Sequence, residues 1–259
     1  DRDKLLFWFV QSGMWGRFSG STESYIDKDL ESFEGEDGGL DKLLSQLRLW
    51  HGSMLVEADH FTGWSKGARF YPVLYMMTRM GQSLDWGTGI ELKANLLGNM
   101  SKLEVHHIFP RAQLKKRKYN KTMINALGNF CFLTKDTNLK ISAKPPEVYF
   151  EEVERNHPGA LASQWIPMDR DLWKMDSYPD FLEARKELLA REVNTRLKEL
   201  LHGDTKWLES ESNTQLIETK PQIVGSIDSD EEEADLEAIN QWIVEQGMHA
   251  GEMSYDYSN

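Results

Sequence analysis

The sequence of 259 residues contains a single cysteine, Cys131. One cysteine cannot form an internal disulfide, and the CxxC pairs that hold a structural zinc ion are absent. Long apolar runs are also missing, because the longest stretch, Leu5 to Val10, falls far short of the roughly 20 residues that cross a bilayer. No basic and apolar leader opens the chain. These absences predict a protein of the reducing cytoplasm that has no membrane partner.

An initiating methionine is missing too, because the first residue is Asp1. We therefore expect a piece of a longer protein. The length is ample for one or two domains with a substantial core, since about 100 to 200 residues per domain is usual.

Positive charge is scarce, since 30 Lys and Arg stand against 42 Asp and Glu, for a net charge of −12. Such a balance argues at first against a nucleic-acid partner. The average hides a strong segregation along the chain. Residues 102–144 carry ten basic and two acidic residues, a net charge of +8, whereas residues 204–259 carry fourteen acids and two lysines. The basic segment is thus a candidate surface for binding phosphate groups.

Apolar residues recur at helical spacing through most of the chain, as is typical of core packing. The spacing predicts helices over 4–10, 23–33, 40–50, 68–80 and 90–97, from residue 149 onward, over 178–201, and over 236–246. Between residues 102 and 146 the pattern changes. There we expect a strand (103–109), a basic loop (112–124), a second strand (130–133) and a short helix (134–144). Pro110 ends the first strand, and Pro145 with Pro146 ends the short helix.

Polar residues that could take part in catalysis or metal binding lie in this segment: the pair His106-His107, then Asn129, then Asn138. Hydrolysis of a phosphodiester needs a base that works near neutrality, a divalent cation, and cationic groups that hold the strand. Histidine is the natural base, and histidine and asparagine both bind divalent metals. Each residue also has an ordinary alternative. The histidines could be packing residues, Asn129 a turn residue and the lysines a solvated loop.

Taken together, residues 106–110, 127–129 and 138–144 resemble the motif of the HNH, or ββα-metal, endonucleases. More narrowly, they resemble the HNH domain at the C-terminus of GmrSD-type restriction enzymes. The stretch LGNFCFLTKDTNLKISAKPP, residues 127–146, is similar to the signature of that subfamily, and the resemblance covers roughly 103–149. The preceding hundred residues, including Trp15 to Ser21, resemble the helical region that follows a ParB-like domain in such proteins.

The resemblance implies a fold that is mainly α (α+β), a helical scaffold with an embedded ββα-metal HNH motif. We expect residues 1–101 to form a helical region after a missing N-terminal ParB-like nucleotide-binding domain. Residues 102–203 would form the HNH nuclease domain with C-terminal helices, and residues 204–259 an acidic linker and terminal helix. The implied partners are double-stranded DNA from phage or plasmid and that N-terminal domain, and a homo-oligomer is left open.

Roles for individual residues also follow from the resemblance. His107 matches the general base, Asn129 the residue that orients the base, and His106 and Asn138 the metal ligands. One divalent ion is implied, Mg²⁺ or Mn²⁺, with Ni²⁺ or Zn²⁺ as alternatives because two neutral ligands favour them in bare affinity. Seven basic residues are expected to contact DNA: Arg111, Lys115, Lys116, Arg117, Lys118, Lys140 and Lys144.

The implied function is that of a metal-dependent DNA endonuclease, a nicking module of a bacterial anti-phage restriction protein. Some relatives, the SspE-like proteins, act together with phosphorothioate modification of host DNA. Two alternatives stay open: a catalytically silent DNA-binding or regulatory module of a multidomain defence NTPase, and an RNA-directed nuclease. The acidic segment 204–259 suggests a further hypothesis, in which it occupies the DNA groove when substrate is absent. The alternative is a solvated tail.

One geometric condition limits the site assignment. Consecutive residues of a regular strand point to opposite faces. His106 and His107 can therefore share a metal site only if the strand bends or ends there.

Overall fold

A computed structural model describes residues 1–35, 38–64, 68–93, 95–96 and 98–208 of the chain. The expected acidic linker and terminal helix lie outside the described residues, apart from residues 204–208. The chain divides into two compact units. Of the described residues, the first unit holds 1–60 and 190–208, and the second holds 61–189.

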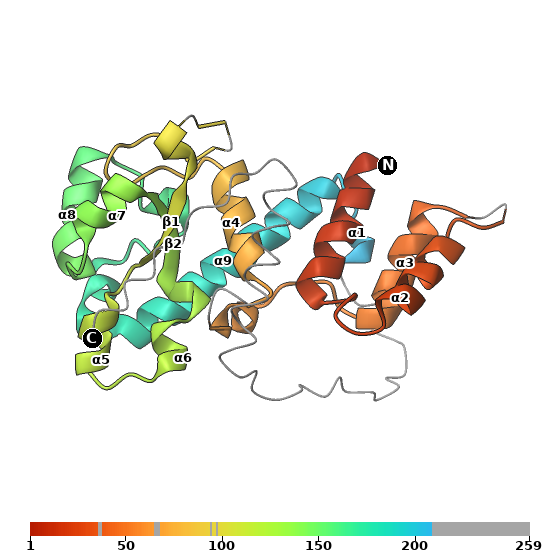
Figure 1. Ribbon diagram of the computed structural model, residues 1–259, viewed down its shortest axis with the longest axis horizontal. Helices are drawn as coiled ribbons and strands as arrows, with labels where there is room; N and C mark the ends of the chain where they lie inside the picture. Colours follow the sequence, from red (N-terminus) through yellow and green to blue (C-terminus); the bar gives the residue numbers. More distant parts are fainter. Residues whose placement is uncertain (36–37, 65–67, 94, 97, 209–259) are drawn as a thin grey trace. The chain divides into compact units, whose positions relative to one another are not determined.

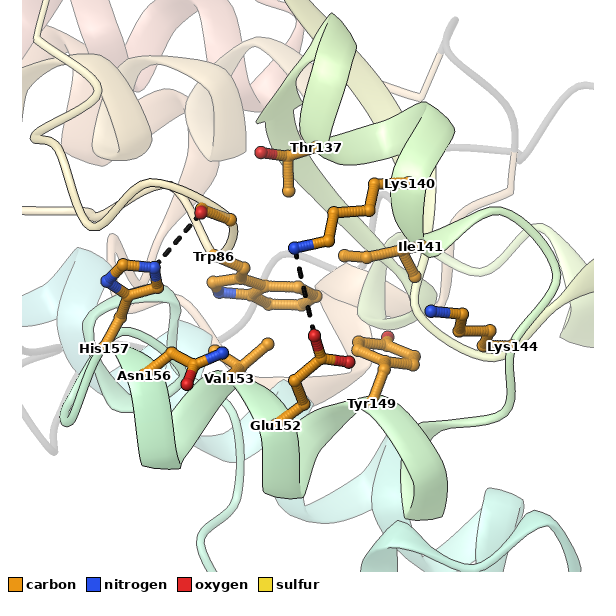
Figure 2. Close-up of a pocket in the computed structure, with 11 residues that line it drawn as sticks. Trp86, Thr137, Lys140, Ile141, Lys144, Tyr149, Glu152, Val153, Asn156 and His157 are labelled. Carbon is orange, nitrogen blue, oxygen red and sulfur yellow. Dashed lines mark hydrogen bonds and ion pairs between the residues drawn. The ribbon is translucent and has the colours of Figure 1, made fainter.

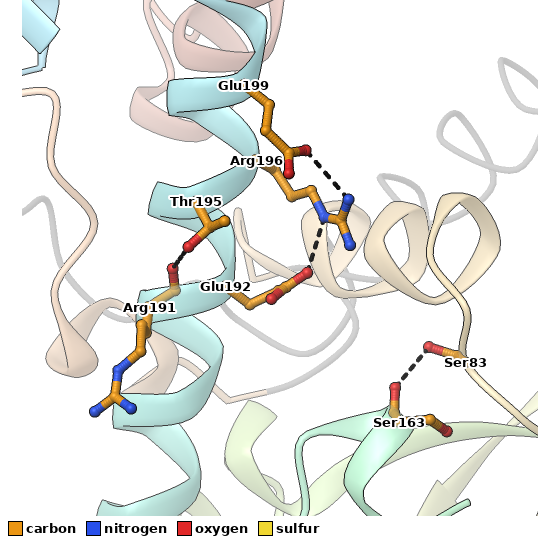
Figure 3. Close-up of polar contacts among 7 residues, drawn as sticks. All are labelled: Ser83, Ser163, Arg191, Glu192, Thr195, Arg196 and Glu199. Atoms are coloured by element: carbon orange, nitrogen blue, oxygen red, sulfur yellow. Dashed lines mark hydrogen bonds and ion pairs between the residues drawn. The ribbon is translucent and has the colours of Figure 1, made fainter. Parts of the chain in front are cut away.

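The first unit is helical. It contains α1 (Arg2–Trp15), α2 (Thr22–Glu31), α3 (Leu40–His51) and the C-terminal part of α9 (Tyr178–Leu200) (Figure 1). Helix α1 ends at Gly16, whose φ of 68° is the left-handed conformation that glycine adopts without strain. The exposed side of α9 is lined with charge, where Arg196 pairs with Glu192 and Glu199 (Figure 3).

A buried ion pair joins the segment after α1 to α2 in this unit. The Arg17 guanidinium donates to both carboxylate oxygens of Asp29, at 2.6 and 2.9 Å, and lies over the rings of Tyr25 and Trp50. Both partners of the ion pair are buried, so the loss of either would leave an uncompensated charge in the interior.

The second unit is built around two antiparallel strands, β1 (Leu103–His107) and β2 (Phe130–Thr134). Their register pairs Leu103 with Thr134 and His107 with Phe130. The surrounding helices are α4 (Tyr71–Met80), α5 (Arg111–Lys116), α6 (Lys121–Ile124), α7 (Lys135–Ile141), α8 (Pro146–Asn156) and the first part of α9 (Figure 1). Helix α7 follows β2 directly, so the order is strand, connection, strand, helix.

The core of the second unit is rich in aromatic residues. Its buried members include Trp86, Phe109, Tyr149, Phe150 and Phe181. The rings meet edge-to-face or tilted at centroid distances such as 4.8 Å for Tyr149 and Phe150 and 4.7 Å for Phe109 and Phe181, the arrangement that aromatic quadrupoles favour. This packing places β1, β2, α7 and α8 in one continuous core.

The predicted fold class is confirmed, because the chain is mainly α with a small two-stranded sheet. Two local expectations are wrong. Residues 90–97 form no helix where they are described, because Glu91 bridges to Leu84, and the buried Leu92 donates its amide to the carbonyl of Ser83. The expected basic loop 112–124 instead contains α5 and α6, since Leu114 and Ile124 reach the core and hold their turns against it.

The two units divide between residues 60 and 61 and within α9. One element boundary differs from expectation. Strand β1 ends at His107 rather than at Phe109, because the side chain of Asn129 takes over the hydrogen bonds of Phe109. Among the described residues, no helix combines the length and the apolar character that crossing a bilayer requires.

One buried carboxylate ties the loop before β1 to the start of α7. Asp85 is fully buried and accepts six hydrogen bonds, at 2.5 to 3.2 Å, from Gly87, Thr88, Thr134 and Thr137. Nearby, the Ser83 hydroxyl donates to the carbonyl of Ser163 (Figure 3). Because Thr134 is the N-cap residue of α7 and Thr137 lies in its first turn, Asp85 sets where this helix begins and stabilises its N-terminus.

Replacing Asp85 should strongly destabilise the protein. Asp85→Ala leaves several buried donors without an acceptor, so we expect the free energy of unfolding to fall by about 3 kcal/mol or more, measured by urea denaturation. Asp136→Ala removes an exposed carboxylate from the first turn of the same helix and should cost no more than about 1 kcal/mol. Equal losses in the two variants would contradict the role given to Asp85.

Candidate metal and catalytic site

His106 lies on β1 with its side chain toward α7 and is only 3% exposed. Its Nδ1 lies 2.8 Å from Oδ1 of Asn138, which α7 carries one position after Thr137. The imidazole ring packs edge-to-face against Trp86 and Tyr149, with centroids 6.0 Å away in both cases. The structure therefore brings together the two residues that were expected to bind the metal.

Burial controls the protonation of His106. It lowers the pKa of the imidazole to about 4, although the hydrogen bond to Asn138 opposes the shift, so the ring is neutral near pH 7. Neutral imidazole is the form that binds a metal. The ring nitrogen Nε2 is buried and has no hydrogen-bond partner among the described residues.

Glu104 joins the pair, and the sequence analysis did not single it out. The Nδ2 amide of Asn138 donates to Oε2 of Glu104 at 2.7 Å, which turns Oδ1 of Asn138 toward His106. Glu104 lies two residues before His106 on the strand, so both side chains leave the same face. This i and i+2 spacing is the signal that could have identified it.

The donor atoms fit a divalent cation. Two neighbouring ligands of an octahedral ion bound at about 2.1 Å lie about 3 Å apart. The 2.8 Å between Nδ1 of His106 and Oδ1 of Asn138 is close to that separation. In the metal-free protein this contact is a hydrogen bond that Nδ1 donates, so the hydrogen would have to move to Nε2 before Nδ1 could bind an ion. Glu104 adds a carboxylate beside them, so the donors comprise an imidazole nitrogen, an amide oxygen and a carboxylate. No group of three His, Cys, Asp or Glu that could hold a metal occurs in the described part of the chain, and this trio contains an asparagine.

His107 faces the other way. It is opposite Phe130 in the register, and the two rings meet edge-to-face at 4.9 Å. Its Nε2 lies 3.1 Å from Oδ1 of Asn125, the residue that ends α6. His107 is partly exposed and is the last residue of β1. The strand thus presents His106 toward α7 on one face and His107 toward α6 and β2 on the other.

Asn129 is fully buried directly before β2, and its side chain hydrogen-bonds backbone groups. Its Oδ1 accepts from the amide of Phe109 at 2.8 Å, and its Nδ2 donates to the carbonyls of Phe109 and Ile124 at 3.1 and 2.9 Å. Its own carbonyl accepts from the amide of Ile108. Asn129 therefore holds the end of β1 and the end of α6 together, close to both histidines.

The seven basic residues that were expected to bind DNA are all exposed. Arg111 and Lys115 to Lys118 lie on α5 and the turn that follows, Lys140 lies in the last turn of α7, and Lys144 lies in the segment between α7 and α8. Two of the seven have loose acidic partners, Arg117 with Asp176 at 3.3 Å and Lys140 with Glu152 at 3.8 Å. Exposed pairs of this kind contribute little to the free energy of folding.

A shallow pocket lies beside α7, between this helix and α8 (Figure 2). The indole of Trp86 lines it, and Lys140 and Lys144 stand along the α7 side with Glu152 opposite Lys140. His157 accompanies them and hydrogen-bonds the carbonyl of Gly87. Lys140 of α7 and Lys144, which follows the helix, therefore flank a hollow beside the helix that carries Asn138.

Comparison with known proteins adds little about activity. No family model matches the chain, and no solved structure matches it. The chain is similar to an uncharacterized protein of the archaeon Methanocaldococcus jannaschii, MJ0686, at 27% identity over 158 residues. That match covers 59% of this chain and 26% of the relative. The chain therefore spans about a quarter of the length of the relative that it matches.

Metal binding can be tested without any nuclease assay. Titration of the folded protein with Mn²⁺, followed by electron paramagnetic resonance, should reveal a site that His106→Ala weakens at least tenfold. Asn138→Leu provides a second test at a partly exposed position, and Glu104→Gln should weaken binding about 10- to 100-fold if its carboxylate orients or binds the ion. His157→Ala changes a histidine outside the trio and should leave the affinity unchanged. Undiminished binding in all three site variants would contradict this metal site.

Proposed function

We propose that this chain is the metal-dependent DNA endonuclease module of a restriction or anti-phage defence protein, with an HNH-type site on β1, β2 and α7. The observation that carries the proposal is the contact between His106 of β1 and Asn138 of α7, at 2.8 Å, within a strand, strand, helix unit. The order of the elements and the residue types are those that the resemblance implies. Asn129 adds support, because its side chain hydrogen-bonds the backbone of Phe109, just after the two histidines, and that of Ile124 in α6.

In the proposed reaction His107 accepts a proton from a water molecule as the water attacks the phosphorus atom. The bond from phosphorus to the 3′ oxygen breaks, so the products are a 5′-phosphate and a 3′-hydroxyl. His106 and Asn138, with Glu104 beside them, would hold the divalent cation, which supplies positive charge to the phosphate and the leaving oxygen. His107 is the last residue of β1, and the proposal requires a phosphodiester to lie across this end of the strand, where the side chains of His106 and His107 diverge.

The substrate proposed is double-stranded DNA. The exposed basic residues on and directly after α5 and α7 support it, because lysine and arginine in a +8 segment neutralise phosphate charge. A site with one base and one metal cuts one strand, so the expected product is a nick. The buried, free Cys131 is consistent with a reducing compartment, and a cytoplasmic location is part of the proposal.

Plasmid nicking tests the proposal directly. Wild-type protein with Mg²⁺ or Mn²⁺ should convert supercoiled plasmid into open circles, and His107→Ala should reduce the rate at least about 100-fold, the usual contribution of a general base. His202→Ala, an exposed histidine of the first unit, is the matched control and should cut at the wild-type rate.

DNA binding without cutting in either metal would reject this function and favour the silent binding module. Undiminished cutting by His107→Ala would reject His107 as the base. A preference for RNA over duplex DNA in the same assay would redirect the substrate class.

A further inference from the structure

His107 forms a hydrogen bond with Asn125, a residue to which the proposed reaction gives no role. Nε2 of the imidazole and Oδ1 of the amide lie 3.1 Å apart, although the residues are 18 positions apart in sequence. An amide oxygen can only accept a hydrogen bond, so its partner nitrogen must carry the hydrogen. A neutral imidazole with hydrogen on Nε2 has its lone pair on Nδ1.

The backbone around Asn125 is well anchored, so its side chain can determine which ring nitrogen of His107 carries the hydrogen. It ends the short helix α6, and its backbone amide donates to the carbonyl of Lys121 at 3.0 Å. At the other end of α6, the side chain of Asn120 accepts from the amide of Met123 at 2.8 Å. The hydroxyl of Tyr178 donates to the carbonyl of Met123 at 2.5 Å and anchors the helix to α9.

The residues on either side of Asn125 are fixed as well. The carbonyl of Ile124 accepts from Asn129, the same side chain that holds the end of β1. On the other side, Ala126 is buried and bridges to Trp64. The distance between His107 and Asn125 is therefore set by backbone that Asn129 holds at both ends.

Packing also restricts the orientation of the His107 ring. Phe130 meets it edge-to-face, with an interplanar angle of 84°. The ring is thus guided by an aromatic neighbour and by one directional hydrogen bond. This combination of a fixed orienting acceptor and a base is the arrangement that prepares a histidine for proton transfer.

We propose that Asn125 is a positioning residue for the base: it keeps hydrogen on Nε2 of His107, so that Nδ1 accepts the proton from water. This inference rests on the proposed endonuclease function. Asn125→Ala should lower the single-turnover nicking rate about tenfold, the effect of losing one hydrogen bond of ordinary strength, and should leave DNA affinity unchanged. Asn125→Asp retains an acceptor at the same place and should restore the rate.

A spectroscopic measurement separates positioning from a merely structural role. Ring nitrogen and proton correlations in ¹⁵N-histidine-labelled, metal-free protein report which nitrogen carries hydrogen, and His107→Ala assigns the signals. Wild type and Asn125→Asp should carry it on Nε2, and Asn125→Ala should lose that preference. Asn120→Ala removes the cap at the other end of α6, so it should lower the melting temperature without changing the tautomer.

The outcomes are distinct from those that test the endonuclease itself. A wild-type protein that cuts DNA, with Asn125→Ala equal in rate and in tautomer, overturns the role of Asn125 and leaves the nuclease intact. Hydrogen on Nδ1 of His107 in the wild type also overturns it. A wild-type protein that cuts no nucleic acid overturns the endonuclease, whatever tautomer His107 adopts.

Discussion

The buried carboxylate of Asp85 is the interaction on which the geometry of the candidate site depends. Its six hydrogen bonds join the loop around Gly87 and Thr88 to the first turn of α7, through Thr134 and Thr137. Asn138 is the next residue of that helix, and its amide reaches both His106 and Glu104 of β1. A shift of one residue in the start of α7 would turn Asn138 by about 100° around the helix axis and away from the strand. The position of the proposed metal ligands is thus a consequence of helix capping inside the core.

Two further polar groups support the opposite side of the hairpin. Arg185 of α9 is fully buried and donates to the carbonyls of Gly128, Phe130 and Gln164, while burial lowers the pKa of its guanidinium to about 10. It stays charged at neutral pH and holds the backbone at the start of β2. Asn129 holds the end of β1 and the end of α6. An interior with such directional polar contacts specifies one arrangement more strictly than apolar packing alone.

Much of this arrangement could be predicted from the sequence, because it depends on local signals. Pro110, Pro145 and the polar turn at Gly128 delimit two short strands and a helix, and the spacing of apolar residues marks α2, α3, α4 and α9. Helices α5 and α6 were missed because each is short and has one buried residue, too few to show a helical spacing of apolar residues. Asp85 and Asn125 were missed for another reason. Their partners are 49 and 18 residues away, so only the tertiary fold brings them together.

The central claim is that the end of β1 and α7 together bind a divalent cation and the phosphate to be cut. Crystals of the protein with Mn²⁺ and a short DNA duplex, with diffraction measured at the manganese absorption edge, test it most directly. The account predicts an anomalous peak within bonding distance of His106 and Asn138, with a backbone phosphate beside it and His107 facing the scissile bond. A manganese ion bound elsewhere, or DNA lying away from this end of the strand, would contradict the account.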